Sequence, residues 1–549
     1  MAAGQPEMDW YTAFIEQEQA SRAGSLVSSE GIIERAMKRE RAIANAATRY
    51  IAHPRAILNS QVPVNALPNE LLAEIFVDVQ REDLSLSCLQ MTGVCRHWRA
   101  LATATAALWT NIDLSWHPAC VRHFFELSAD MPVDVYSMSE LEVDDVVEMI
   151  SPYTHRIRGF VYGLGDEEAD NVSEMITSLG SVLPNLQTLE LDSPDDSLEP
   201  FGGHFPLLRS LKTTGFSFGF ISGMLVNLVE LEINEVPTRP EMMKLLQGLA
   251  ACPCLERLSL SSSLPQQDMN AQASLVGPVS LPRLKLFDIF DDVMYIARFC
   301  AYLALPAGTC VSLHCRAFRY LATTNRLELE PHHIVVPRYD HSKWPVYSKV
   351  QSIRLSATSK DDWTQLHAYP DPDLRGYPSI LMHFPHETHK TMAHCLVDVL
   401  NQCGDVFSAS PVVRFVVVGE RLDEHTPSYG DEVLLSANVW RMALLCLPRL
   451  EHLEVRGRDD VGLLFEALGP FPTADAEMFC PHLKTLSVGG CSSERARKML
   501  QDALAFRVSR GSRLGTLTLS LHTGAWNGRS RYLEELRPLV DNLNVRPQE

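Results

Sequence analysis

Four histidines lie close together and come nearest, by type and spacing, to a metal site: His383, His386, His389 and His394. Zinc sites place two histidines four residues apart on a helix, or combine histidine with paired cysteines. The first three histidines here are spaced by three residues, and Pro385 interrupts the run. We therefore expect a loop that leads into a helix, and no bound metal. The alternative is an enzyme that uses this cluster, which metal analysis of the purified protein would reveal.

Thirteen cysteines are spread along the chain without a dense framework. Cys252 and Cys254 flank one proline, but no second pair stands at metal-ligand spacing, so burial as small packed side chains is expected. Cys95 falls in a predicted helix and is interpreted in the same way. The odd count and the polar opening Met1–Glu7, which lacks a secretory leader pattern, predict reduced thiols and a cytoplasmic or nuclear location.

Motifs for nucleotide binding and hydrolysis are missing from the sequence. Gly163 and Gly165 lack the third glycine of a dinucleotide loop, and they run into three acidic residues that would repel a phosphate. There is no Gly-Lys-Ser/Thr phosphate loop and no Gly-x-Ser-x-Gly nucleophile elbow. We expect a chain that is not an enzyme and that uses no cofactor.

Charge and composition narrow the class of partner. Lys and Arg total 48 against 68 for Asp and Glu, which gives a net charge of −20 over 549 residues. A surface of this sign argues against nucleic-acid partners and against anionic membranes. Apolar residues make up 46% of the chain, enough for a large core. The most apolar long stretch, Val293–Leu313, contains Arg298 and Pro306, so no membrane span is expected.

The elements that must position any functional residue begin with a helix predicted over Ser29–Ala52. Ser29 can cap its start, and Pro54 marks its expected end. The basic run Lys38–Arg41 is interpreted as the solvated face of this helix rather than as a nuclear signal.

Three apolar signatures follow between residues 67 and 109. The first, Leu67–Phe76, carries Leu-Pro-Asn-Glu-Leu-Leu, in which the proline suits the first turn of a helix. The second, Val94–Arg99, predicts another helix, and Leu108-Trp109 closes the block. Three short helices form a small core, so part of this apolar surface is expected to meet a partner. The alternative is that these residues are only the core of a helical hairpin.

This block resembles the F-box motif, because the three signatures occur in the order and approximate spacing of that family. Ala106 departs from the pattern, since many members carry proline before the Leu-Trp pair. F-box domains dock on the Skp-type adaptor of SCF cullin–RING ubiquitin ligases. The resemblance implies that docking is carried by Leu67, Pro68, Leu71, Leu72, Ile75 and Phe76, with Val94 and Trp98 divided between docking and packing.

An apolar triplet recurs downstream: one residue, a second three positions later and a third two beyond it. The intervals are mostly about 20–33 residues, a period typical of stacked repeats. The last two members alternate as in a strand that points them into a core. Clear copies are Leu186-Leu189-Leu191, Leu228-Leu231-Ile233, Leu255-Leu258-Leu260, Leu284-Phe287-Ile289, Val350-Ile353-Leu355, Leu450-Leu453-Val455, Leu483-Leu486-Val488 and Leu514-Leu517-Leu519, with Val413-Val416-Val418 among the weaker ones.

A Leu-x-x-Leu-x-Leu strand followed by a helical segment resembles a leucine-rich repeat, although the asparagine position common in that family is mostly absent. The resemblance implies an outward strand residue in each repeat that could bind a target protein. These residues are Glu190, Lys212, Glu232, Ser259, Asp288, Arg354, Val417, Glu454, Ser487 and Thr518. Their mixed charges do not predict a strongly charged target. Pro331–Pro378 is the expected insertion.

The predicted fold class is α/β, with a polar segment and helix (1–60), a three-helix F-box domain (61–115) and an irregular leucine-rich-repeat solenoid (116–549). This combination resembles the fungal F-box substrate receptors of SCF ubiquitin ligases. It implies a subunit that binds the Skp-type adaptor, and through it a cullin–RING ligase, and that holds a protein target. The alternative is a repeat scaffold whose F-box serves assembly outside ubiquitination.

Overall fold

The computed structural model describes residues 29–82, 87–137, 141, 143–163, 183–192, 205–266, 277–316, 342–357, 363–385, 400, 406–419, 436–456, 461–470, 478–489, 493–521 and 529–547. They belong to two compact units. The first ends at Asn111 and takes in His123–Met131, and the second contains Ile112–Arg122 and Pro132 onward. Each unit is described by itself below.

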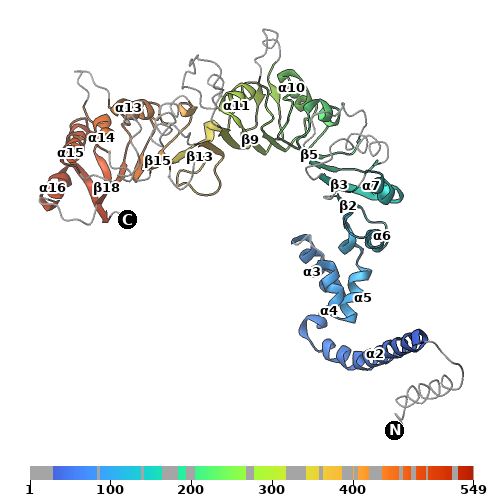
Figure 1. The fold of residues 1–549 in the computed structure, drawn as a ribbon. Helices are drawn as coiled ribbons and strands as arrows, with labels where there is room; N and C mark the ends of the chain where they lie inside the picture. Colours follow the sequence, from blue (N-terminus) through green and yellow to red (C-terminus); the bar gives the residue numbers. More distant parts are fainter. Residues whose placement is uncertain are drawn as a thin grey trace. The chain divides into compact units, whose positions relative to one another are not determined.

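The first unit is helical (Figure 1). Its core is formed by Leu72, Phe76, Cys88, Met91, Ala102, Leu108, Trp109, Phe124 and Phe125. Its elements are α2 (Ser29–Ser60), η1 (Pro63–Ala66), α3 (Asn69–Glu82), α4 (Ser87–Val94), α5 (Arg96–Ala104), η2 (Ala106–Trp109) and the end of α6 (Pro118–Leu127).

Helix α2 is longer than the sequence predicts. The expected end at Pro54 is wrong, because the helix continues through this residue to Ser60. A proline inside a helix removes one N–H donor and leaves the carbonyl four residues earlier unbonded. That carbonyl belongs to Tyr50, whose side chain is exposed, so water can replace the missing donor.

The second unit is built on a mixed sheet in which most strands are parallel. Its first half adds one strand after another in chain order. The strands are β1 (Asn111–Asp113), β2 (Val133–Ser137), β3 (Ile157–Gly163), β4 (Thr188–Asp192), β5 (Ser210–Thr214), β6 (Glu230–Asn234), β7 (Arg257–Ser261), β9 (Leu286–Asp292) and β11 (Cys310–Arg316).

Chain order is then reversed over three strands. β11 pairs in parallel with β14 (Ile380–Pro385), which pairs antiparallel with β13 (Trp363–Tyr369), and β13 pairs antiparallel with β12 (Ser352–Ala357). β12 pairs in parallel with β15 (Arg414–Gly419). The expected insertion Pro331–Pro378 therefore contains two sheet strands, and its residues before 342 lie outside the described part of the chain.

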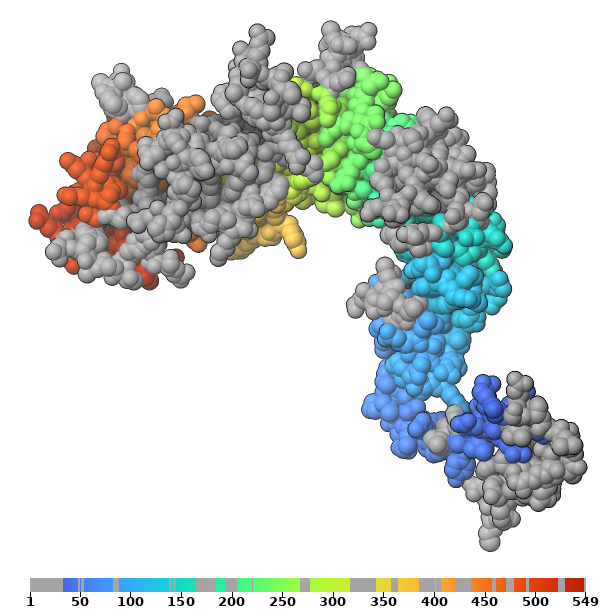
Figure 2. Space-filling view, viewed as in Figure 1, coloured from blue at the N-terminus to red at the C-terminus, as the bar shows by residue number. Residues whose placement is uncertain are grey.

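The remaining strands follow β15 in chain order, all parallel. Helices cover one face of this sheet, as the ribbon shows for α10, α11 and α13–α15, and side chains fill the space between the ribbons (Figures 1 and 2). The strands are β16 (His452–Arg456), β17 (Thr485–Gly489), β18 (Leu514–Leu521) and β19 (Val540–Pro547), and the labelled helices are α7 (Val143–Ile150), α10 (Met242–Ala250), α11 (Val293–Cys300), α13 (Ala437–Leu445), α14 (Gly462–Leu468), α15 (Glu494–Ser509) and α16 (Arg529–Leu536).

A repeated turn explains the apolar-Pro dipeptide before many strands. In each copy the N–H of the first triplet residue bonds to the carbonyl three residues earlier, as in Leu186 to Leu183 (3.4 Å) and Leu450 to Leu447 (3.1 Å). Proline occupies the second position of this turn, where its fixed φ is favoured. The same bond occurs at Leu208, Leu255, Leu284 and Leu483.

Candidate functional site

One face of α3 carries apolar side chains that are exposed rather than buried in the core. Leu71, Ile75 and Val79 are 48%, 44% and 43% exposed. Their spacing of four residues aligns them in one stripe along the helix, and exposed Pro68 lies one turn earlier. We call Leu71, Ile75 and Val79 the docking stripe. A row of exposed apolar groups on a small helical unit is typical of a protein-binding surface.

The adjacent side of α3 holds the helix to its own unit. Leu72 and Phe76, which the family resemblance places with the docking residues, are only 1% and 2% exposed. Both lie in the core and have no surface to offer a partner. Gln80, one turn further along, is also buried and accepts a hydrogen bond from the backbone N–H of Cys88 at 3.1 Å. The buried and the exposed apolar residues of α3 thus lie on different sides of the helix.

Trp98 connects three elements of the first unit. Its ring lies 4.7 Å from that of Phe76, measured between centroids. Its indole Nε1 donates to Oδ1 of Asn65 at 2.6 Å, and Nδ2 of Asn65 donates to the carbonyl of Asn59 at 2.7 Å. The half-buried Trp98 therefore fixes η1 and the end of α2 against α3. Half-buried Leu67 lies between η1 and α3.

The junction of α4 and α5 combines an exposed apolar residue with a helix cap. Val94 is 58% exposed and remains available to a partner. Cys95 caps α5, because its Sγ accepts the backbone N–H of Trp98 at 3.4 Å. The sequence indicates helix packing for Cys95 and misses this capping role. The closing Trp109 is buried, with its Nε1 donating to the carbonyl of Ala102 at 2.8 Å.

In the second unit, the strand register brings the predicted target-binding residues into one row. Glu190 pairs with Lys212, Lys212 with Glu232, Glu232 with Ser259, and Ser259 with Asp288. The row continues through Ser312, Leu381 and His367 to Arg354, and then through Val416, Glu454, Ser487 and Thr518 to Asn544. We call the sheet face that carries this row the outward face.

Val417 is a correction to this set. The prediction that it points outward is wrong, because Val417 is 0% exposed and Val416 takes the outward position beside Arg354. The triplet on β15 is therefore Val412-Phe415-Val417, one residue earlier than predicted. Phe415, Val416 and Val417 are all buried, so this strand lacks the polar alternation that fixes register in a sequence.

Three histidines meet on the outward face, and the sequence pattern indicates only one of them. His383 lies on β14, not in a loop as expected, next to His314 on β11 and near His367 on β13. His386, His389 and His394, its neighbours in the sequence, lie outside the described residues. We call His314, His367 and His383 the imidazole patch. Their meeting depends on the reversed strand order, which spacing along the chain does not reveal.

Burial and the neighbouring positive charges favour the neutral form of two of these rings, His383 and His367. Burial, reinforced by His314 and His367, lowers the pKa of His383 to about 4. Burial and the nearby Arg354 also lower the pKa of His367. No group of histidine, cysteine or acidic side chains among the described residues has an arrangement that could hold a metal ion.

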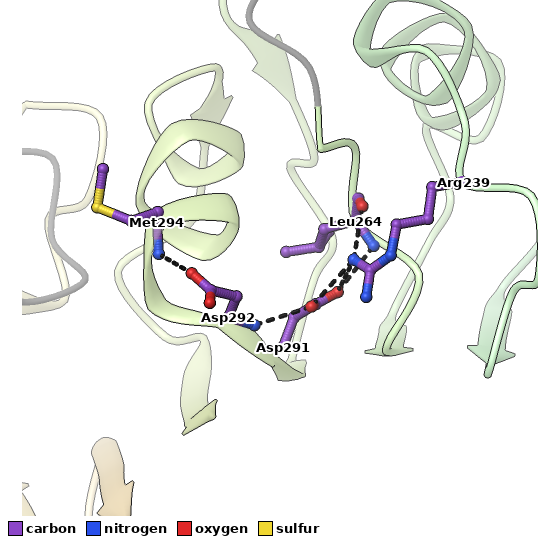
Figure 3. Close-up of polar contacts among 5 residues, drawn as sticks. All are labelled: Arg239, Leu264, Asp291, Asp292 and Met294. Atoms are coloured by element: carbon purple, nitrogen blue, oxygen red, sulfur yellow. Dashed lines mark hydrogen bonds and ion pairs between the residues drawn. The ribbon is translucent and has the colours of Figure 1, made fainter. Parts of the chain in front are cut away.

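A buried ion pair lies at the carboxyl ends of β6, β7 and β9 (Figure 3). Nη1 of Arg239 donates to both carboxylate oxygens of Asp291, at 3.0 and 2.8 Å, and to the carbonyl of Leu264 at 2.8 Å. Asp291 also accepts the backbone N–H groups of Leu264 and Asp292, at 2.9 and 2.8 Å. Because the Asp291 carboxylate is fully engaged by these donors, we interpret the pair as a tie between loops rather than as a reactive centre.

Six of the described cysteines have thiols whose environment disfavours the thiolate. Burial raises the pKa of Cys120, Cys252, Cys300, Cys310, Cys315 and Cys480, that of Cys480 to about 12. A reactive cysteine needs the opposite shift, toward the thiolate. The predicted burial of Cys252 is confirmed, and Cys254 beside it is half-buried. Within the described ranges, no helix is long and apolar enough to cross a bilayer.

Comparison with known proteins adds one assignment. A search of the curated proteins finds no match to the chain. The family models give a match that covers η1, α3, α4, α5, η2 and β1, and so includes the docking stripe and Trp98. Residues 64–115 match the F-box-like family, and the chain therefore carries an F-box-like domain.

Proposed function

We propose that the chain is the substrate-recognition subunit of an SCF-type cullin–RING ubiquitin ligase. The observation that carries the proposal is the docking stripe, because it lies within the F-box-like domain and remains exposed while the other side of α3 is packed. In this proposal Leu71, Ile75, Val79 and Val94 contact the Skp-type adaptor. Leu72, Phe76 and Trp98 shape the surface from beneath.

We propose that the second unit is an irregular leucine-rich-repeat array that holds the target. Two features support this: parallel strands that follow one another in chain order, and a repeated turn that places an apolar ladder in the core. Its outward face offers one residue per strand in a continuous row, which suits an extended protein segment.

The proposed mechanism is proximity. One unit binds the adaptor and the other binds the target, so a ubiquitin-conjugating enzyme meets a target lysine at a raised effective concentration. In this proposal catalysis is left to the partner proteins, and the raised pKa values of buried thiols such as Cys300 and Cys480 are compatible with that division. The proposal implies a cytoplasmic or nuclear location.

Introducing charged residues into the docking stripe by substitution tests the proposed adaptor contact. We expect Leu71→Asp with Ile75→Asp to weaken co-purification with a Skp-type adaptor by at least about 100-fold, because each carboxylate would be buried against apolar groups. The matched control is Met442→Asp with Leu445→Asp, which changes two apolar residues of α13 with similar exposure, 54% and 55%.

Adaptor binding that survives in the stripe variant would overturn the proposal. Circular dichroism must show that both variants keep their helical content. Co-precipitation of a cullin with the unaltered chain distinguishes a ligase subunit from a scaffold whose F-box-like domain acts outside ubiquitination. Adaptor binding without any cullin would favour the scaffold.

A further inference from the structure

The side chains of the outward face change from paired charges to packed rings where the strand order is reversed. On β5–β7 the charged side chains satisfy one another across neighbouring strands. Lys212 Nζ lies 3.6 Å from Glu232 Oε2, and Arg257 Nη2 lies 3.0 Å from Glu230 Oε2. Charges that are already paired have little to gain from a partner. The imidazole patch and its surroundings differ from this pattern.

The rings of the patch pack against one another. The centroids of His314 and His383 are 4.5 Å apart with perpendicular planes, and those of His367 and His383 are 6.3 Å apart. Phe290 extends the group on β9, with its ring 6.2 Å from that of His314. Leu381 occupies the outward position of β14 beside His367. Rings and an aliphatic side chain thus form one partly exposed surface.

Two charged residues border this surface on opposite sides. Asp288 on β9 lies 3.5 Å from Nε2 of His314, with 52% of its side chain exposed. Arg354 on β12 is exposed and pairs in register with His367. Among the described residues, no carboxylate lies within ion-pair distance of Arg354. A segment that crosses the strands would therefore meet Asp288, the rings and Arg354 in that order.

Building on the proposed function, we propose that the imidazole patch is the principal contact for the target, and that it takes an extended protein segment with an aromatic or aliphatic side chain followed by an acidic residue. The apolar side chain lies over His314, His383 and Leu381, and the acidic residue pairs with Arg354. The apolar faces of packed rings and the Leu381 side chain offer a partner area to bury, and contacts of this kind at the centre of an interface dominate binding. The excess of acidic residues over basic ones, 68 against 48, disfavours a nucleic acid at this face.

A displayed library of random dodecapeptides, selected on the full-length chain, tests this chemistry. We expect the selected peptides to share an apolar residue next to Asp or Glu. His367→Ala with His383→Ala should weaken their binding about tenfold or more. Arg354→Glu should reverse the preference and select Lys or Arg at the acidic position. His452→Ala and Arg546→Glu are the matched controls, since both residues lie on the outward face away from the patch.

Several outcomes would overturn the inference. These are a library without enrichment, selected peptides without an acidic residue, and peptides that bind the double histidine variant as tightly as the unaltered chain. Competition by a single-stranded oligonucleotide that depends on Arg354 would also contradict it. Adaptor co-purification is measured on the same variants. If the adaptor does not co-purify with the unaltered chain, the proposed ligase role is refuted, while the peptide specificity still stands.

Discussion

At the scale of single residues, the burial of neighbouring side chains decides which role each one plays. Leu71 and Leu72 are identical in type and adjacent in the sequence, yet one is exposed and the other lies in the core. The apolar spacing predicts helix α3 but does not show which side meets the rest of the unit. The same holds for His383, because the histidine rings that it contacts, those of His314 and His367, belong to other strands.

The titration of His383 provides a test at this scale. Its pKa in the folded chain is about 4, against 6.5 for an ordinary histidine. Between these values the unfolded chain binds the proton first, so stability present above pH 6.5 is lost as the pH falls toward 4. We expect His383→Gln to reduce this loss by an amount of the order of 1 kcal/mol, after allowance for solvent screening.

Histidine signals followed by NMR through an acid titration give the measurement, and unfolding by urea at several pH values gives the energy. His452→Gln serves as the comparison: burial also lowers the pKa of His452, so its replacement should act in the same direction but by less than that of His383. A pKa near 6.5 for His383 would contradict the packing described for the patch.

At the scale of elements, the strands and turns follow closely from the sequence. The apolar triplets identify the buried positions of β4, β6, β7, β9, β16, β17 and β18, and the preceding proline identifies the turn. Two features could not be predicted. β15 is apolar on both faces, which hides its register, and the order β14-β13-β12 depends on pairings between distant segments. The outward residues of β4–β9 and of β16–β18 were therefore predictable, but the middle of the row and the imidazole patch were not.

The Arg239–Asp291 pair allows a prediction about loops. The pair holds the segments after β6 and β7 to the end of β9, so its loss should loosen both connections together. We expect Asp291→Asn to reduce the free energy of unfolding of the second unit by about 2–4 kcal/mol, because Arg239 would keep a largely buried charge without its partner. Denaturant unfolding measures this value.

Asp288→Asn is the control for this change. Asp288 lies three residues earlier on the same strand with half of its side chain exposed, and its replacement should change stability by less than about 0.5 kcal/mol. Equal effects of the two substitutions would show that the buried pair does not tie the loops.

At the scale of the whole molecule, the chain consists of two compact units with different tasks in the proposed function. The F-box-like match covers residues 64–115 in the smaller helical unit and the first strand of the larger one. A large mixed sheet fills most of the larger unit. Assigning one partner to each unit explains why an apolar stripe and a polar sheet face occur in the same protein.

Two units predict two unfolding transitions. Leu72→Ala should lower the free energy of unfolding of the first unit by about 2–4 kcal/mol, because it opens a cavity in the core. Leu71→Ala, on the exposed side of the same helix, should stay within about 0.5 kcal/mol. Differential scanning calorimetry checks both, and the transition of the second unit should not move. A single transition shifted as a whole by Leu72→Ala would show that the units unfold together.

The reversed strand order has a consequence for biosynthesis. Through β9 and β11, each new strand can join the sheet edge left by the strand made just before it. β12 cannot do so, because its place in the sheet is reached only through β13 and β14. During translation, β11 therefore stays at the edge of the sheet until β14, which ends at Pro385, has been made. Until then its backbone N–H and C=O groups are unpaired, and an edge of this kind favours aggregation. We therefore expect a nascent molecule to be most prone to aggregation while the middle of the chain is being made.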